Sequence, residues 1–230
     1  MALAQIESAE QVAQITRLRT QIGQMQRRPA TPERNPVPAP LAGLFPSRGL
    51  RPGAAYTLPD SPSLMLALAG EVSRSGSWCA FVGMPDLSMQ AAESHGVAVD
   101  RLALIPSPGV RWLSAVSSAA EVFPLVAVRA PRTAAPGEAA RLSARLRDRG
   151  STLLVLGAWP GAELSLSLSE PEWRGIGTGH GLIASRAVTI AAAGRALPSA
   201  RRVRVLLPGP SGAVEEVPTA RRAHLRAVAA

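Results

Sequence analysis

The sequence predicts an α/β fold, with a mostly parallel sheet flanked by helices and an antiparallel edge toward the C-terminus. Short apolar runs alternate with segments of helical spacing between residues 49 and 159, which is typical of strand–helix–strand units. Two further apolar runs then follow each other without a helix between them. A third observation is an N-terminal segment of helical spacing, which a proline-rich stretch separates from the rest.

The alternating part contains short buried runs that end at Gly, Pro or Ser, as strands do, and longer periodic runs between them. The predicted strands are 54–58, 78–83, 102–106, 125–129 and 152–159, and the predicted helices are 63–75, 88–95, 110–122 and 137–149. Crossovers between parallel strands are right-handed, so this order predicts a parallel sheet. The runs 181–195 and 201–209 are predicted as two strands joined by a turn, which form the antiparallel edge.

The N-terminal arm, residues 1–28, is predicted as an amphipathic helix. Four apolar residues follow a 3-4-3 spacing and form one stripe: Ile15, Leu18, Ile22 and Met25. A single helix of this length is marginal in water, so the stripe docks on its own domain, on a partner or on a second copy. Residues 29–46 contain six prolines and are predicted as a stiff linker. The core is expected at 47–210, followed by a basic, loosely ordered tail at 211–230.

Composition limits the chemistry of the chain. The 230 residues carry a net charge of +9, and all 25 basic residues are Arg. Without lysine, neither a Schiff base nor the phosphate-binding lysine of a P-loop can form. The arginine excess fits contact with nucleic acid or an acidic protein, or a solvated surface. Cys79, the single cysteine, lies in an apolar run and is expected to be buried and inert. No apolar run is long enough to span a membrane and no signal peptide is evident, which predicts a cytoplasmic location, at the nucleoid if the protein contacts DNA.

The order of elements between residues 47 and 207 resembles the core of RecA-like proteins. The resemblance rests on three stretches, "SRSGSWCAFVG", "HGVAVDRLALIPSPG" and "LSARLRDRGSTLLVLGAW", which stand in the order and spacing of that family. It implies a RecA-like core in which the loop after the first strand would hold nucleotide phosphates. The corresponding loop here has the sequence "LPDSPSLM".

This loop lacks the residues that hold ATP. A Walker A loop needs glycines, whose backbone N–H groups surround the phosphates, and a lysine that neutralises them. The loop has neither, because its residues are Leu58, Pro59, Asp60, Ser61, Pro62, Ser63, Leu64 and Met65. The family's catalytic glutamate is replaced by Pro85 beside Asp86, and Arg129 stands where the Mg²⁺-binding aspartate ends its strand. The sequence therefore predicts a protein that is not an enzyme and that holds no cofactor or metal.

A RecA-like core without these groups, on a short Arg-rich chain, resembles the actinobacterial ImuA-prime proteins. The stretch "WPGAELSLSLSEPEWRGIGTGHGLIASR" is the most similar to that group. The resemblance implies an adaptor in DNA-damage-induced (SOS) mutagenesis and translesion synthesis. Its partner would be an ImuB-type Y-family pseudo-polymerase, with an error-prone replicative polymerase bound indirectly. RecA-type cores polymerise when an N-terminal segment docks on a neighbouring core. By analogy, this core would accept such a segment from ImuB, or its own helix would dock on a second copy.

Two alternatives belong to other functional classes. A SulA-like inhibitor of cell division would use the same kind of core to bind the division tubulin FtsZ. A divergent RecA-like ATPase would need a non-standard phosphate loop, and tight binding of ATP with Mg²⁺ would identify it. A Y-family polymerase homologue encoded next to this chain would favour the adaptor.

Weak DNA contact is a separate expectation, since arginine can pair with phosphates bidentately. The candidates come from the glycine-rich loop at 175–181, from the last predicted strand and from the tail: Arg174, His180, Arg201, Arg202, Arg204, Arg221 and Arg222. An ordinary connecting loop and a solvated basic edge are the alternatives. The three histidines are far apart and have no metal-ligand spacing, and "SLSLSE" has no nucleophile elbow.

Overall fold

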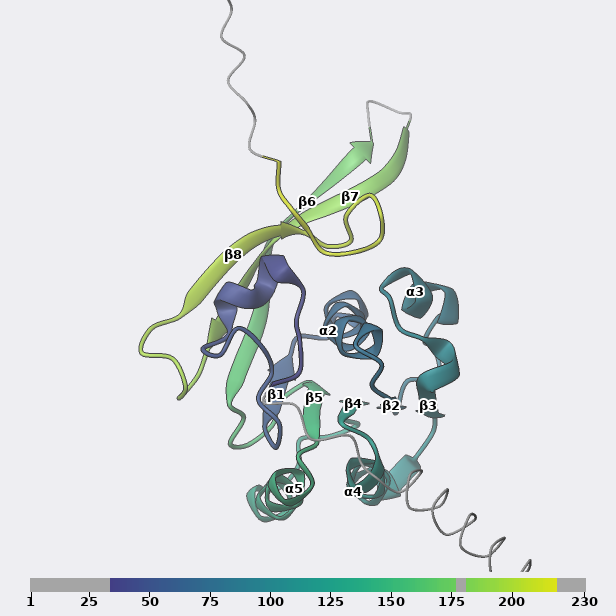
Figure 1. The fold of residues 1–230 in the computed structure, drawn as a ribbon, viewed down its shortest axis with the longest axis vertical. Helices are drawn as coiled ribbons and strands as arrows, with labels where there is room; N and C mark the ends of the chain where they lie inside the picture. Colours follow the sequence, from purple (N-terminus) through teal and green to yellow (C-terminus); the bar gives the residue numbers. More distant parts are fainter. Residues whose placement is uncertain (1–33, 177–180, 219–230) are drawn as a thin grey trace, which may run out of the picture. The chain divides into compact units, whose positions relative to one another are not determined.

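A computed structural model describes residues 34–176 and 181–218, which form a nine-stranded sheet in the order β3-β2-β4-β5-β1-β6-β7-β8-β9 (Figure 1). The strands are β1 (Ala55–Leu58), β2 (Cys79–Val82), β3 (Leu102–Ile105), β4 (Leu125–Arg129), β5 (Thr152–Leu156), β6 (Leu164–Ile176), β7 (Gly181–Ala193), β8 (Arg201–Leu206) and β9 (Glu215–Glu216). The helices are α2 (Pro62–Arg74), α3 (Met89–Ser94), α4 (Trp112–Val122) and α5 (Pro136–Arg149), with short 3-10 turns η1 (Ala39–Leu44), η2 (Val99–Arg101) and η3 (Gly109–Arg111).

The predicted α/β architecture is confirmed. Strands β1 to β5 pair in parallel, β6 pairs in parallel with β1, and β6 to β9 continue as antiparallel neighbours. Helices α2 and α3 cover one face of the parallel half, and α4 and α5 cover the other (Figure 1). Each face encloses its own apolar cluster, because successive residues of a strand point to opposite faces.

Local signals explain where the helices begin and end. Ser61 precedes α2 and its Oγ accepts the backbone N–H of Leu64 at 3.4 Å, while Pro62 takes the first helical position, where its missing N–H costs nothing. Helix α5 ends at Arg149 and is capped by Gly150, whose φ of 65° is left-handed and therefore favours glycine. These boundaries lie within a residue or two of the predicted ones.

Residues 34–46 are not an extended linker, contrary to the prediction from their prolines. Leu41, Leu44 and Phe45 are fully buried in the main apolar cluster, and 39–44 forms η1. From β8, Arg201 donates to the carbonyl oxygens of Gly43 at 3.1 Å and Phe45 at 3.3 Å. The prolines shape a compact turn, and the apolar residues between them bury. The compact unit accordingly includes residues 34–46, whereas the sequence placed its boundary at 47.

The C-terminal boundary also differs from the prediction. Residues 211–218 belong to the fold, because β9 pairs with β8 and the Glu215 carboxylate accepts the backbone N–H of Ser211 at 3.1 Å. The remainder of the predicted tail, 219–230, and the predicted N-terminal helix with its stripe lie outside the described residues. None of the helices in the described ranges is both long and apolar enough to cross a membrane.

Strands β6 and β7 form a long hairpin, and β6 was not predicted. Leu164 and Leu166 are buried whereas Ser165 and Ser167 are exposed, so the "LSLSLS" run alternates as a half-buried strand does. The register shifts between Ser169 and Glu172, and Glu170 within this bulge has a φ of 53°. Bulges twist a ribbon, so this one sets the direction of the outer half of the hairpin.

Candidate functional site

The candidate site lies at the carboxyl ends of β1, β2 and β4. The chain leaves β1 and β2 toward α2 and α3 on one face, and leaves β3 and β4 toward α4 and α5 on the other. Since β2 lies between β3 and β4 in the sheet, neighbouring connections diverge there. Such a switch in direction opens the crevice in which α/β proteins hold their ligands.

The loop after β1 is closed by its own side chains. Ser61 Oγ accepts the Leu64 N–H and lies 3.3 Å from Ser63 Oγ, so the first turn of α2 is partly capped from within. Leu64 and Met65 are fully buried in the core below. These two positions, where the resemblance requires a lysine and a hydroxyl group, therefore face away from the crevice into apolar surroundings.

Arg129, the last residue of β4, joins the loops after β1 and β2. Its Nη1 donates to Asp86 Oδ1 at 2.8 Å, and its Nε donates to Asp60 Oδ1 at 3.3 Å. The guanidinium side chain is 28% exposed, whereas the Asp60 and Asp86 side chains are 75% and 70% exposed. The loop after β1, the loop after β2 and the end of β4, to which the resemblance assigns nucleotide binding and hydrolysis, are thus brought together. Two ion pairs around the Arg129 guanidinium occupy this position instead.

Two cavities adjoin Arg129. The smaller, of about 380 Å³, lies between α2 and α3 and is lined by Pro62, Ser63, Leu66, Asp86, Leu87, Ser88, Ala91, His95 and Arg129. The larger, of about 710 Å³, lies on the β3 side and is lined by Gly83, Pro106, Pro108, Gly109, Val110, Trp112, Arg129, Ala130, Pro131 and Arg132. Arg129 belongs to both linings and therefore stands at the boundary between the two cavities.

Burial shifts the pKa of two titratable side chains near the site, His95 and Cys79. His95 is buried, its Nδ1 has no hydrogen-bond partner among the described residues, and burial together with the charge of Arg74 lowers its pKa. Burial raises the pKa of the Cys79 thiol to about 12, in agreement with the expectation of an inert cysteine. Within 34–176 and 181–218, no group of three or more His, Cys, Asp or Glu residues is placed to hold a metal ion.

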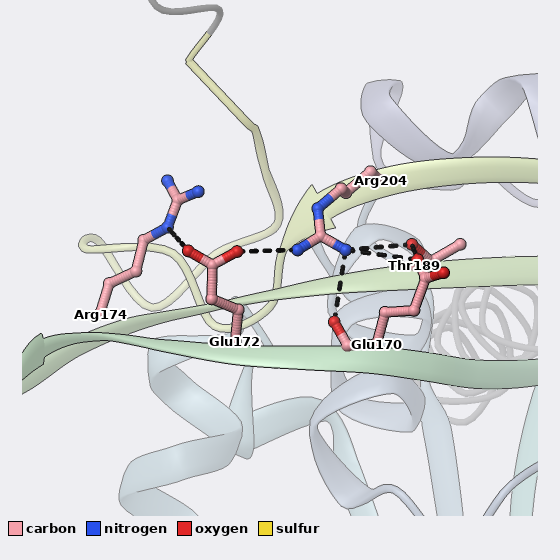
Figure 2. A network of polar contacts seen from close by, with 5 residues as sticks. All are labelled: Glu170, Glu172, Arg174, Thr189 and Arg204. Atoms are coloured by element: carbon pink, nitrogen blue, oxygen red, sulfur yellow. Dashed lines mark hydrogen bonds and ion pairs between the residues drawn. The ribbon is translucent and has the colours of Figure 1, made fainter.

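The candidate DNA-contacting arginines lie on β6 and β8, away from this crevice. Arg204 donates to Glu172 and Glu170, and Arg174 pairs with Glu172 at 3.5 Å (Figure 2). Arg201 is engaged with η1, and Arg202 is exposed on the same strand. His180, Arg221 and Arg222 lie outside the described residues. The structure thus joins Arg174 and Arg204 through a shared carboxylate, which reduces the positive charge that they offer to a phosphate.

Strand β3 is an open edge of the sheet that sequence reasoning did not single out. The Gly83 N–H donates to the Ile105 carbonyl at 2.9 Å, so the backbone of Ile105 faces β2. Because N–H and C=O groups of successive residues point to opposite sides of a strand, the backbone of Leu104 faces outward. Leu104 is 43% exposed, and Val99 and Val110 near the two ends of β3 are exposed as well. The apolar run "LALI" carries no signal that separates an edge strand from a central one.

Comparisons with known proteins support the fold. The RadB recombinase, a solved structure, superposes with a TM-score of 0.54 at 16% identity, covering 78% of this chain and 97% of RadB. This likeness confirms a RecA-like fold. The uncharacterized protein Rv3395c of Mycobacterium tuberculosis (strain ATCC 25618 / H37Rv) is 33% identical over 120 residues, which are 51% of this chain and 59% of that protein. The chain therefore matches little more than half the length of this curated relative.

A family model described as the MT3502 N-terminal domain matches residues 43–161. This segment runs from η1 to the turn after β5 and contains strands β1 to β5 and the Arg129 network. Because the match covers more than half of the 230 residues, the chain belongs to the MT3502 N-terminal domain family.

Proposed function

We propose that this protein is a non-catalytic RecA-like adaptor that binds an ImuB-type Y-family pseudo-polymerase in DNA-damage-induced (SOS) mutagenesis. The observation that carries the proposal is Arg129 between Asp60 and Asp86 at the end of β4. A nucleotide-hydrolysing core needs a carboxylate at this place to hold Mg²⁺, and a guanidinium there repels the metal. A RecA-like fold with this substitution keeps its surfaces for protein contacts but loses Mg²⁺-dependent nucleotide hydrolysis.

The edge of β3 is the proposed docking place for the partner. It offers three backbone groups that face away from β2: the carbonyl oxygen of Leu102 and both the N–H and the carbonyl oxygen of Leu104. The Leu102 N–H is already bonded to Val99, and Pro106 has no N–H, so the ladder is short. An extended segment of the partner would add one strand here, with main-chain hydrogen bonds for affinity and the exposed Leu104 side chain for selectivity.

Co-purification of the full chain with the Y-family homologue encoded nearby tests this proposal. Leu104→Pro removes the outward N–H without breaking a bond to β2, which is why edge strands tolerate proline. Leu104→Ala keeps the N–H and serves as the matched control. We expect a complex with the natural chain and with Leu104→Ala, and at least a tenfold weaker complex with Leu104→Pro, for one lost main-chain hydrogen bond and one unpaired group on the partner.

The arm and the core can be separated by truncation. Because the core includes residues 34–46, the arm is removed by deleting residues 1–33, which leaves η1 in place. If the truncated chain still co-elutes with the partner, the core makes the contact. If only the full chain co-elutes, the predicted stripe makes it. Absence of any complex at micromolar concentrations would contradict the adaptor function and favour the alternative, a division inhibitor that binds FtsZ.

The non-catalytic part of the proposal has its own test. Titration calorimetry with ATP and Mg²⁺ on the full chain should give no saturable heat, because the loop after β1 provides neither a lysine nor glycine N–H groups. Tight, Mg²⁺-dependent binding would identify a divergent ATPase instead. In the cell, the adaptor would act in the cytoplasm at the nucleoid, where the polymerases work.

A further inference from the structure

We propose that the larger cavity beside Arg129 binds a small organic anion with an apolar body. This site is distinct from the loop after β1 and does not depend on the adaptor role. Its volume of about 710 Å³ falls within the usual range of small-molecule sites, roughly 300–1,000 Å³. It opens at the carboxyl ends of β2, β3 and β4, where neighbouring connections leave the sheet in opposite directions, and this is where α/β folds hold ligands.

The polar side chains that line this cavity are all hydrogen-bond donors. They belong to Trp112, Arg129 and Arg132, whereas the other lining side chains are Gly, Ala, Val and Pro. An indole and a guanidinium donate and do not accept. A ligand that satisfies such a lining must supply acceptors, so a carboxylate, phosphate or sulfonate fits and an amine does not.

Unused donors remain at the lining. The Trp112 indole N–H is buried and has no hydrogen-bond partner among the described residues. A buried donor without a partner is unfavourable, and a ligand acceptor that reaches it would satisfy it. Arg129 donates through Nε and Nη1 to its two aspartates, and no described residue accepts from its Nη2. The Arg132 guanidinium lies 5.9 Å from the centre of the Trp112 ring and is held by Glu138 at 2.9 Å.

Arg129 is also placed to exchange partners. Its side chain is mostly buried, whereas Asp60 and Asp86 are exposed and can turn toward water without a desolvation cost. A ligand anion would therefore replace these aspartates on a guanidinium that stays in position. Removal of one competing aspartate should strengthen binding of the anion, and removal of the guanidinium should weaken it.

The apolar part of the ligand would lie against the other wall. Pro106, Pro108 and Pro131 line the cavity, and Val110, which lies in η3 just before α4, is 97% exposed. An isolated valine this exposed is common at protein surfaces, but beside a cavity it offers a contact that only a bound molecule can cover. Prolines lose no side-chain freedom when they are covered, so this wall binds a flat apolar group at little entropic cost.

The test compares two fluorescent probes with the same apolar body on the full chain. One is 8-anilinonaphthalene-1-sulfonate, an anion, and the other is N-phenyl-1-naphthylamine, which lacks the sulfonate. We expect saturable binding of the anion with one site per chain. Arg129→Gln should weaken it by at least tenfold, while Asp86→Asn should tighten it by several-fold. The neutral probe should bind equally to all three proteins.

Matched variants localise the probe. Val110→Asp places a negative charge at the cavity and should abolish binding of the anion, whereas Val122→Asp at the far end of α4 should not change it. Arg149→Gln on α5 controls for the loss of one positive charge. Thermal melts identify any variant that fails to fold. Equal weakening by Arg129→Gln and Arg149→Gln, or unchanged binding in Val110→Asp, would overturn the proposal, and so would an anion affinity no higher than that of the neutral probe.

Discussion

Arg204 on β8 reaches across β7 and donates from Nη2 to Glu172 Oε2 on β6 at 2.9 Å (Figure 2). The same guanidinium donates from Nη1 to the carbonyl oxygen of Glu170 and to Thr189 Oγ1, both at 3.3 Å. Three neighbouring strands are therefore tied together at the bulge of the hairpin. Because exposed ion pairs contribute little to global stability, we infer that this network acts on the local order of the hairpin.

Arg204→Gln should loosen the outer half of the β6–β7 hairpin. We expect amide hydrogen exchange to accelerate about tenfold at residues 172–175 and 182–187, because the bulge loses its cross-strand contacts, while the free energy of unfolding changes by less than about 1 kcal/mol. Arg202→Gln on the same strand is the matched control, since the Arg202 side chain is exposed and bonds to no described residue. Equal exchange in the two variants would contradict the assigned role of Arg204.

Gly70→Ala should destabilise the fold. Gly70 lies in α2 where the helix meets the end of α3, and an added Cβ would overlap the carbonyl oxygen of His95. That oxygen already accepts from Arg74 Nη1 at 3.0 Å, so it cannot move freely. We expect a loss of about 1–3 kcal/mol in urea unfolding, the usual cost of overpacking. Gly43→Ala serves as the control because nothing lies within 4 Å of its added Cβ. A loss of unfolding free energy no larger than that of Gly43→Ala would show that the end of α3 can move away from the added methyl group.

His95 should make stability depend on pH below neutrality. Its pKa is lowered in the fold, chiefly by burial and also by the charge of Arg74, from the ordinary value of 6.5. Between the folded pKa and 6.5 the unfolded chain binds more protons, so the free energy of unfolding falls as the pH falls through this window. His95→Asn should lose this contribution, and the difference between the two proteins should shrink as the pH drops. A pH-independent difference in parallel denaturant titrations would contradict the assignment.

Cys79 should be unreactive in the native protein. The thiol is buried in β2, and burial raises its pKa to about 12, so almost no thiolate exists at neutral pH. We expect a disulfide reagent such as dithiobis-nitrobenzoate to label the chain only after denaturant unfolds it. Rapid labelling of the folded chain at pH 7 would show that β2 opens locally. Cys79→Ala is the blank for any background absorbance.

The sequence was sufficient to predict the parallel half of the fold, because each strand there is a short apolar run separated from the next by a segment of helical spacing. It did not lead to a prediction of β6, although the alternating Leu and Ser residues of this strand have the period of two that is typical of a half-buried strand. It also misassigned the segment around Leu41 and Phe45, since proline content alone does not distinguish an open linker from a compact turn. In both segments the structure depends on which side chains are buried, and local composition does not show this.

The candidate site was visible only in parts. Asp60, Asp86 and Arg129 were each recognised as departures from the nucleotide-binding pattern, but separately. Their opposite charges at the ends of neighbouring parallel strands could have predicted the ion pairs, because such ends meet at one edge of a sheet. The cavity with donor side chains could not be predicted, since it depends on how the turn at η3 approaches the loop after β4.

The position of β1 has a consequence for how the chain is made. Among the described strands it is synthesised first, yet its neighbours in the sheet are β5, which begins at Thr152, and β6, which begins at Leu164. Turn η1 similarly accepts a hydrogen bond from Arg201 of β8, which is synthesised much later. The earlier apolar segments therefore lack their final contacts until these later strands are made, and contacts so distant in sequence form slowly. The sheet around β1 therefore cannot be completed before β5 and β6 have been synthesised.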